Sequence, residues 1–163
     1  MTVNPPAQQP PASPGSSGPG TGGPGTGVPG TGVPGASEPR PVVLHDSEAE
    51  REVWDDPVKG LLGFRGLFSS ERTPTNALTT GVTDLPPDGW LGLHRHTPAE
   101  VYYVLDGEGV VTLDGVEHAV RTGTSVFIPG DVEHGIRNTT GSALRLFYVF
   151  AVDSFATIEY RFS

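Results

Sequence analysis

Two histidines separated by a single residue are the first feature of this sequence that could do chemistry. His94 and His96 lie in the segment G-W-L-G-L-H-R-H-T-P-A-E-V-Y-Y-V-L, and Glu100 follows four residues after the second histidine. Residues i and i+2 of a strand point to the same face, about 6.6 Å apart, so both imidazoles can reach one ion. Pro98 interrupts this strand, and Glu100 opens a new run that is rich in strand-forming residues.

A third histidine supplies a fourth candidate ligand. His134 lies on the second strand of the segment G-T-S-V-F-I-P-G-D-V-E-H-G-I-R-N, after a Pro-Gly turn. Three imidazoles and one carboxylate form a mixed nitrogen and oxygen set that suits a first-row transition metal. This set differs from the cysteine-rich cage of a structural zinc site. We therefore expect a single metal bound by four residues, with two positions of an octahedral ion left for water, dioxygen or substrate.

The segments around these residues read as short strands separated by turns. Asp106-Gly107 and Asp114-Gly115 each sit between two β-rich runs, which predicts two hairpins. Val42–Leu44 is a candidate edge strand, and residues 46–54 read as a short helix or capped turn. About ten strands with little helix predict an all-β sandwich or barrel. The alternation begins at Gly63, and the further strands are expected at 77–85, 90–96, 100–105, 108–113, 116–120, 124–128, 133–138, 144–152 and 157–162.

Composition separates an N-terminal tail from a folded domain. Residues 1–41 contain 11 Pro and 10 Gly and repeat the unit Pro-Gly-Thr-Gly, so we expect them to be disordered. The folded domain is expected at 42–163. A net charge of -9 argues against nucleic acid or an anionic membrane as a partner. The chain has no cysteine, signal peptide or long apolar run, which favours a soluble cytoplasmic protein.

The candidate ligands carry a family resemblance. The chain resembles the cupin superfamily, whose first motif is G-x5-H-x-H-x3,4-E-x6-G and whose second is G-x5-P-x-G-x2-H-x3-N. The first motif matches His94, His96, Glu100 and Gly107, with Gly89 one residue closer than the pattern asks. The second motif matches at its outer positions, Gly123, Pro129, His134 and Asn138, while Asp131 stands where the motif has its inner glycine.

This resemblance implies a cupin-type double-stranded β-helix, or jelly-roll barrel, and a metal-dependent reaction on a small organic molecule. A mononuclear iron dioxygenase is narrowly favoured, with Fe(II) as the metal and Mn, Ni, Co or Zn as alternatives. A non-redox decarboxylase, isomerase, lyase or polyketide cyclase is the alternative, as is a small-molecule-binding module without catalysis. Small cupins commonly pair, so a homodimer is expected, with residues 42–44 suited to strand exchange.

Strict alternation along the strands predicts which side chains line the pocket beside the metal. If His94 faces inward, so does Trp90; if Glu100 does, so does Tyr102. The same rule places Ile136 and Asn138 on the wall together with His134. We expect these four residues to contact substrate, with the Tyr102 phenol as a candidate general acid or as part of the wall. Trp54, by contrast, is expected to pack against the barrel.

Overall fold

The computed structural model describes residues 39–163, and in this part of the chain it is built almost entirely of strands. The strands are β1 (Glu52–Asp56), β2 (Gly60–Phe68), β3 (Thr79–Leu85), β4 (Trp90–Arg95), β5 (Glu100–Asp106), β6 (Glu108–Leu113), β7 (Val116–Arg121), β8 (Ser125–Ile128), β9 (His134–Asn138), β10 (Leu144–Phe150) and β11 (Arg161–Phe162). Two single-turn 3-10 helices, η1 (Asp46–Glu48) and η2 (Phe155–Thr157), are also present.

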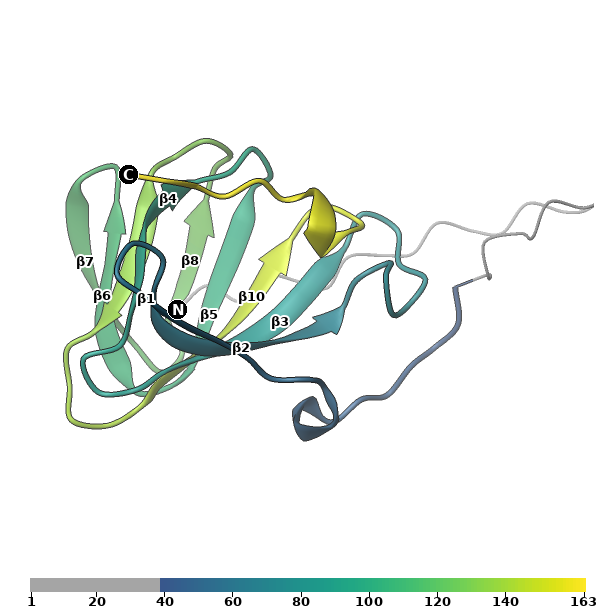
Figure 1. The fold of residues 1–163 in the computed structure, drawn as a ribbon, viewed down its shortest axis with the longest axis horizontal. Coiled ribbons are helices and arrows are strands. Elements are labelled where there is room, and N and C mark those ends of the chain that lie inside the picture. The colour runs from purple at the N-terminus through teal and green to yellow at the C-terminus, as the bar shows by residue number, and fades with distance from the viewer. Residues whose placement is uncertain (1–38) are drawn as a thin grey trace, which may run out of the picture. The chain divides into compact units, whose positions relative to one another are not determined.

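All these strands pair antiparallel in one curled sheet. The hydrogen-bonded order is β7-β6-β9-β4-β2-β3-β10-β5-β8, with β1 added beside β2 and β11 beside β4. Figure 1 shows how the sheet curls so that the strands surround a common interior, with the C-terminal segment crossing along one end. The prediction of an all-β jelly-roll barrel is confirmed. The predicted disordered tail lies outside the described residues, apart from positions 39–41.

The interior is filled by every second residue of the central strands. In β10 the buried positions are Leu144, Leu146, Tyr148 and Phe150, each at most 5 % exposed, and the residues between them are half-buried. The strand's two neighbours, β3 and β5, contribute Leu85 and Val104 to the same core. This period of two is the pattern expected of a strand with one face toward the core.

Two Asp-Gly pairs with the same sequence have different structural roles. Asp114 and Gly115 have φ values of 47° and 79°, and they join β6 to β7 as a two-residue hairpin. This is the conformation that a type I′ turn requires. Asp106 instead belongs to β5, and Gly107 (φ 83°) turns the chain away, because β5 pairs with β8 and β10 but not with β6. The first predicted hairpin is therefore wrong.

The segment before the barrel also differs from the prediction. The sequence predicts a short helix or capped turn over 46–54, and the structure has only a capped 3-10 turn, Asp46–Glu48. Its N-cap is His45, whose Nδ1 accepts a hydrogen bond from the Ser47 backbone. Residues Glu52–Asp56 form β1, which pairs with β2 along its whole length. Residues 42–44 form no strand in the structure. Pairing with β2 outweighs the weak helix signal, because a short helix has little stability of its own.

The C-terminal segment is fastened to the loop after β2. The Glu71 carboxylate accepts hydrogen bonds from the hydroxyls of Ser69 and Ser154. The backbone N–H of Phe155 donates to Ser69 Oγ over 3.0 Å, and that of Ser70 donates to the Asp153 carbonyl over 2.8 Å. These contacts hold η2 and the residues after it against the barrel. Among the described residues, no helix is long and apolar enough to cross a membrane.

Candidate metal centre

The four candidate ligands come together inside the barrel. His94 lies on β4, His96 directly follows that strand, Glu100 opens β5 and His134 opens β9. His94 and His134 are cross-strand partners, which brings the two halves of the site side by side. All four side chains are buried, and one potential ligand atom from each lies within 4.8 Å of the others. The structure thus joins two sequence segments about 40 residues apart into one cluster.

Backbone carbonyls set the orientation of all three imidazoles. Each histidine Nδ1 lies 2.7–2.8 Å from a carbonyl oxygen two residues away, so it carries the proton and donates. The acceptors are the carbonyls of Gly92, Pro98 and Val132. With Nδ1 protonated, each Nε2 presents a lone pair to the centre of the cluster. This is the arrangement by which outer hydrogen bonds orient the histidines of a metal site.

The atoms at the centre fit a bound cation. Nε2 of His94 is buried and has no hydrogen-bond partner among the described residues. The Glu100 carboxylate oxygen Oε2 lies 3.2 Å from Nε2 of both His96 and His134. A buried, unpaired acceptor is costly unless something satisfies it. A divalent transition metal would use all four groups at once, and the donor set of three nitrogens and one oxygen suits such an ion.

Burial keeps the site ready for a metal by disfavouring protonated histidine. The pKa of His94 is lowered from 6.5 to about 4, first because burial penalises the charged ring and then because His134 is close. His94 therefore stays neutral in the folded protein across the physiological pH range. A neutral imidazole is the form that binds metals.

Tyr102 lies on the same strand as Glu100, two residues on, and also faces the interior. Its side chain is 2 % exposed, and its hydroxyl has no hydrogen-bond partner among the described residues. Burial, followed by the negative charge of Glu100, raises the pKa of the Tyr102 phenol well above its usual value. The hydroxyl is thus a buried polar group beside the metal ligands.

Next to the cluster lies a small cavity with a volume of about 30 Å³. Glu100 connects it to the metal ligands, and its remaining lining is mostly aromatic and aliphatic. The lining residues are Trp54, Leu62, Phe64, Thr83, Leu91, Glu100, Tyr102, Ile136, Leu146, Tyr148, Phe155 and Tyr160. An apolar pocket with a few polar groups is the usual form of a small-molecule site.

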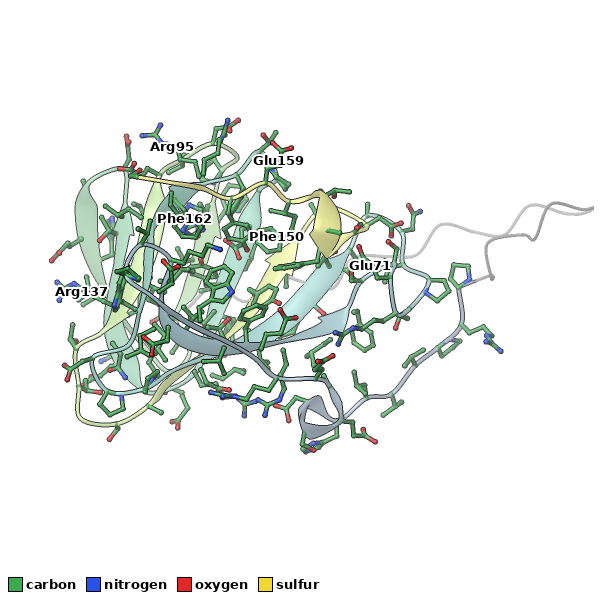
Figure 2. The ribbon with its side chains drawn as sticks, viewed as in Figure 1. Glu71, Arg95, Arg137, Phe150, Glu159 and Phe162 are labelled. Atoms are coloured by element: carbon green, nitrogen blue, oxygen red, sulfur yellow. The ribbon has the colours of Figure 1, made fainter. Side chains whose placement is uncertain are left out.

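Of the four residues expected to contact substrate, the structure brings Tyr102 and Ile136 into this cavity and places Trp90 elsewhere. Leu91 of β4 pairs with Ile136 of β9, and His94 of β4 pairs with His134 of β9. Between these two pairs, β4 has one residue more than β9, which is a β-bulge. Such a bulge reverses the inward and outward alternation along the strand. Leu91 therefore lines the cavity, and Trp90 lines a separate surface hollow beside Arg137. Figure 2 shows Arg137 and Arg95 pointing away from the barrel.

Asn138 is buried, but its side chain is fully engaged with the backbone. The amide group donates to the carbonyls of Leu85, Pro86 and Ser142 at 2.7–3.1 Å, and its oxygen accepts from Thr140. The expectation that Asn138 contacts substrate is therefore corrected. Its amide ties the end of β9 to the turns that flank the barrel.

The turn before His134 accommodates the departure from the motif. Asp131, which stands at the position of the inner glycine, has a φ of 62°, and its N–H donates to the His96 carbonyl over 2.9 Å. Aspartate tolerates this left-handed conformation better than most residues. The Asp131 carboxylate also pairs with Arg161 of β11. The substitution thus keeps the turn that presents His134.

Three aromatic residues, Trp54, Phe155 and Tyr160, form what we call the aromatic wall of the cavity. The Tyr160 ring stacks on His94 with 5.0 Å between centroids, and Trp54 meets Tyr160 edge-on at 6.1 Å. Phe155 meets Tyr160 at 6.2 Å. The sequence interpretation assigned none of these residues to the site. They come from β1 and from the C-terminal segment, where no spacing rule connects them to the histidines.

Comparisons with known proteins agree with this geometry. Residues 81–150 match the family model described as a cupin domain. The chain is 42 % identical over 109 residues to the dimethylsulfoniopropionate lyase DddW of Ruegeria pomeroyi, covering 66 % of this chain and 70 % of that protein. It is 33 % identical over 92 residues to the oxalate-binding protein of Thermotoga maritima, covering 56 % of this chain and 76 % of that one.

A solved structure supports the same fold. The polyketide cyclase RemF from Streptomyces resistomycificus superposes with a TM-score of 0.61 at 22 % sequence identity, covering 68 % of this chain and 79 % of that one. The fold, the buried cluster of three histidines and one glutamate, and the matches in sequence all lead to one assignment. The chain belongs to the cupin superfamily.

Proposed function

We propose that this cupin is a metal-dependent lyase that eliminates a sulfonium leaving group from a small carboxylate, with dimethylsulfoniopropionate as its candidate substrate. The observation that carries the proposal is the buried Tyr102 hydroxyl, which lines the same cavity as the ligand Glu100. The identity of 42 % to DddW, which is named as a lyase for that substrate, supports the reaction class. The dioxygenase favoured from the sequence has no support among the relatives described above and stays a prediction.

The cavity suits the two ends of such a substrate. Dimethylsulfoniopropionate has a carboxylate at one end and a positively charged sulfonium at the other. The carboxylate would approach the cluster of His94, His96, Glu100 and His134. The sulfonium would face the aromatic wall, because the negative faces of aromatic rings attract cations. No lysine or arginine lines the cavity to repel it.

The reaction needs a base beside the carbon next to the carboxylate. In the elimination, the proton on this carbon moves to the base, a carbon–carbon double bond forms, and the carbon–sulfur bond breaks with its electron pair going to sulfur. The products are acrylate and dimethyl sulfide. We assign this base to the phenolate oxygen of Tyr102, which lines the cavity two residues after Glu100. Burial and Glu100 keep the phenol protonated without a metal, and a divalent cation held by the four ligands would favour its deprotonation.

A divalent metal held by the four ligands would polarise the substrate carboxylate and offset the negative charge of Glu100. The chain's own residues then orient the substrate and exclude water. Leu62, Leu91 and Ile136 give the cavity apolar sides. A dry, shaped site strengthens every electrostatic contact in it.

The test loads the purified chain with Fe(II), Mn, Co, Ni or Zn in turn and adds dimethylsulfoniopropionate. Gas chromatography measures dimethyl sulfide, and proton NMR measures acrylate. Loss of a general base typically costs about 10²- to 10⁴-fold in rate, which is the drop expected for Tyr102→Phe with metal content unchanged. Tyr103→Phe is the matched control, because Tyr103 is the next residue and is 45 % exposed on the outer face. A fully active Tyr102→Phe variant, or no product with any metal, would contradict the proposal.

A second candidate function is the binding of a small dicarboxylate without turnover. The likeness to the oxalate-binding protein, at 33 % identity over 76 % of its length, favours this alternative. Isothermal titration calorimetry with oxalate separates the two functions. Oxalate binding that depends on His96, with no product from any sulfonium substrate, would favour the binding module.

A further inference from the structure

Lys59 is the only lysine in the chain and lies in the short connection between β1 and β2. Its backbone is held on both sides. The N–H donates to the Asp56 carboxylate over 2.9 Å, and the carbonyl accepts from the Gly92 N–H over 2.9 Å. The exposed side chain reaches back so that its ammonium lies 5.5 Å from the centre of the Trp54 ring.

Lys59 differs from most of the other positively charged residues in 39–163 because it has no carboxylate partner, a property that it shares with Arg40, Arg51 and Arg121. Lys59 forms no ion pair with any described residue. Six arginines, in contrast, are paired with carboxylates, namely Arg65, Arg72, Arg95, Arg137, Arg145 and Arg161. The partner of Lys59 is an aromatic face, which attracts the ammonium without neutralising it.

Trp54 links this charge to the substrate cavity, whose lining does not itself include Lys59. Trp54 lines the cavity, and it contacts Tyr160, which stacks on the ligand His94. The charged side chain in the cavity lining is the acidic Glu100. Since the whole chain also carries a net charge of -9, a carboxylate that approaches meets repulsion over most of the molecule. Lys59 places one positive charge beside Trp54 in this acidic molecule.

We propose that Lys59 is a specificity-determining residue that captures the substrate carboxylate at the cavity. In leaving the face of Trp54 to meet the carboxylate, the ammonium also frees the indole for the sulfonium of the same substrate. One cation on the ring is thus exchanged for another. This inference rests on the proposed function, and it adds the residue that recognises an anion before the metal cluster does.

Steady-state kinetics on the metal-loaded full chain test the exchange. Exposed charges of this kind are worth a few fold, so Lys59→Met is expected to raise KM about two- to fivefold while kcat stays within about twofold. The dependence of kcat/KM on salt should weaken, because the screened attraction is gone. Lys59→Arg should keep most of the wild-type KM. Arg137→Met is the matched control, since it removes one positive charge from the outer face of β9, beside the separate hollow.

An unchanged KM in Lys59→Met would overturn the proposal. An equal rise in Arg137→Met would overturn it as well, because it would show an effect of net charge alone.

A binding measurement keeps this inference separate from the proposed function. Trp54 and Trp90 are the only tryptophans, so Trp90→Phe leaves Trp54 as the sole fluorescent reporter. Propionate is titrated into this variant with Lys59 intact and with Lys59→Met added. The expected result is a change in Trp54 emission whose apparent Kd for propionate is about two- to fivefold weaker without Lys59.

The two readouts fail independently. A propionate signal that does not depend on Lys59, in a protein that does release dimethyl sulfide, would overturn the role of Lys59 alone. A signal that depends on Lys59, in a protein that forms no product, would overturn the lyase function and keep the capture of a carboxylate.

Discussion

The metal ligands and the aromatic wall meet in one cavity but are built in different ways. His94, His96 and His134 stand on or beside strands of the barrel, and each is oriented by a carbonyl two residues away. Trp54 and Tyr160 come from β1 and the C-terminal segment, which add to the barrel from outside its main strand order. The ligands are therefore fixed by local geometry, and the wall by contacts between distant segments.

This difference separates the chemistry from the choice of substrate. A metal site tolerates little displacement of its ligands, so it benefits from strands and short-range hydrogen bonds. A wall of aromatic rings can be exchanged without disturbing those ligands. Changes in the ligands should therefore abolish function, whereas changes in the wall should alter affinity and leave the metal bound.

The largest effect is expected when a ligand is removed. Changes in residues behind the ligands typically cost about 10- to 100-fold in metal affinity, so His96→Ala should cost at least that much. Elemental analysis by mass spectrometry, on protein purified without a metal resin, measures the bound metal. The matched control is Arg95→Met, because Arg95 precedes His96 and pairs on the surface with Glu133. Equal metal content in His96→Ala and wild type would contradict the assignment of His96 as a metal ligand.

An intermediate effect is expected when the wall is opened. Cation–π contacts are worth about 0.5–2 kcal/mol, so Trp54→Leu should raise KM for the sulfonium substrate about two- to thirtyfold with unchanged metal content. Trp90→Leu is the natural control, since it removes the other tryptophan from outside the cavity. If both variants shifted KM equally, or if Trp54→Leu lost its metal, the separation of wall and ligands would fail.

The smallest effect is expected at the contact that holds the wall in place. Hydrogen bonds from Ser154 and Ser69 lower the pKa of Glu71 from 4.5 to about 2. A lowered folded-state pKa stabilises the protein above pH 4.5, and this contribution is lost as the pH falls toward 2. Because Glu71 is exposed, Glu71→Gln should cost less than about 1 kcal/mol at neutral pH.

Urea unfolding of wild type and Glu71→Gln between pH 6 and pH 2 measures this contribution. The difference between the two proteins should shrink as Glu71 becomes protonated. A constant difference across this range would show that the Glu71 charge does not hold the C-terminal segment.

Local sequence patterns predicted most of the strands, because a period of two reflects burial on one face. They failed where pairing depends on partners elsewhere in the chain. Asp106-Gly107 and Asp114-Gly115 are the same dipeptide, yet only the second closes a hairpin, because β5 finds its partners in β8 and β10. Trp90 was placed in the pocket by alternation, and a bulge in β4 moved Leu91 there instead. The homodimer stays a prediction.

The sequence by itself determined the set of ligands and the jelly-roll fold. The spacing of His94, His96, Glu100 and His134 indicates the ligand set, since side-chain direction along a strand follows from local geometry. The jelly-roll fold followed from the resemblance of these spacings to the cupin motifs. Only the tertiary structure decided what surrounds that set. The aromatic wall consists of Trp54, Phe155 and Tyr160, and Lys59 lies beside Trp54. Both features depend on how β1 and the C-terminal segment pack onto the barrel. Such packing is set by the complementarity of distant surfaces, which no spacing rule records.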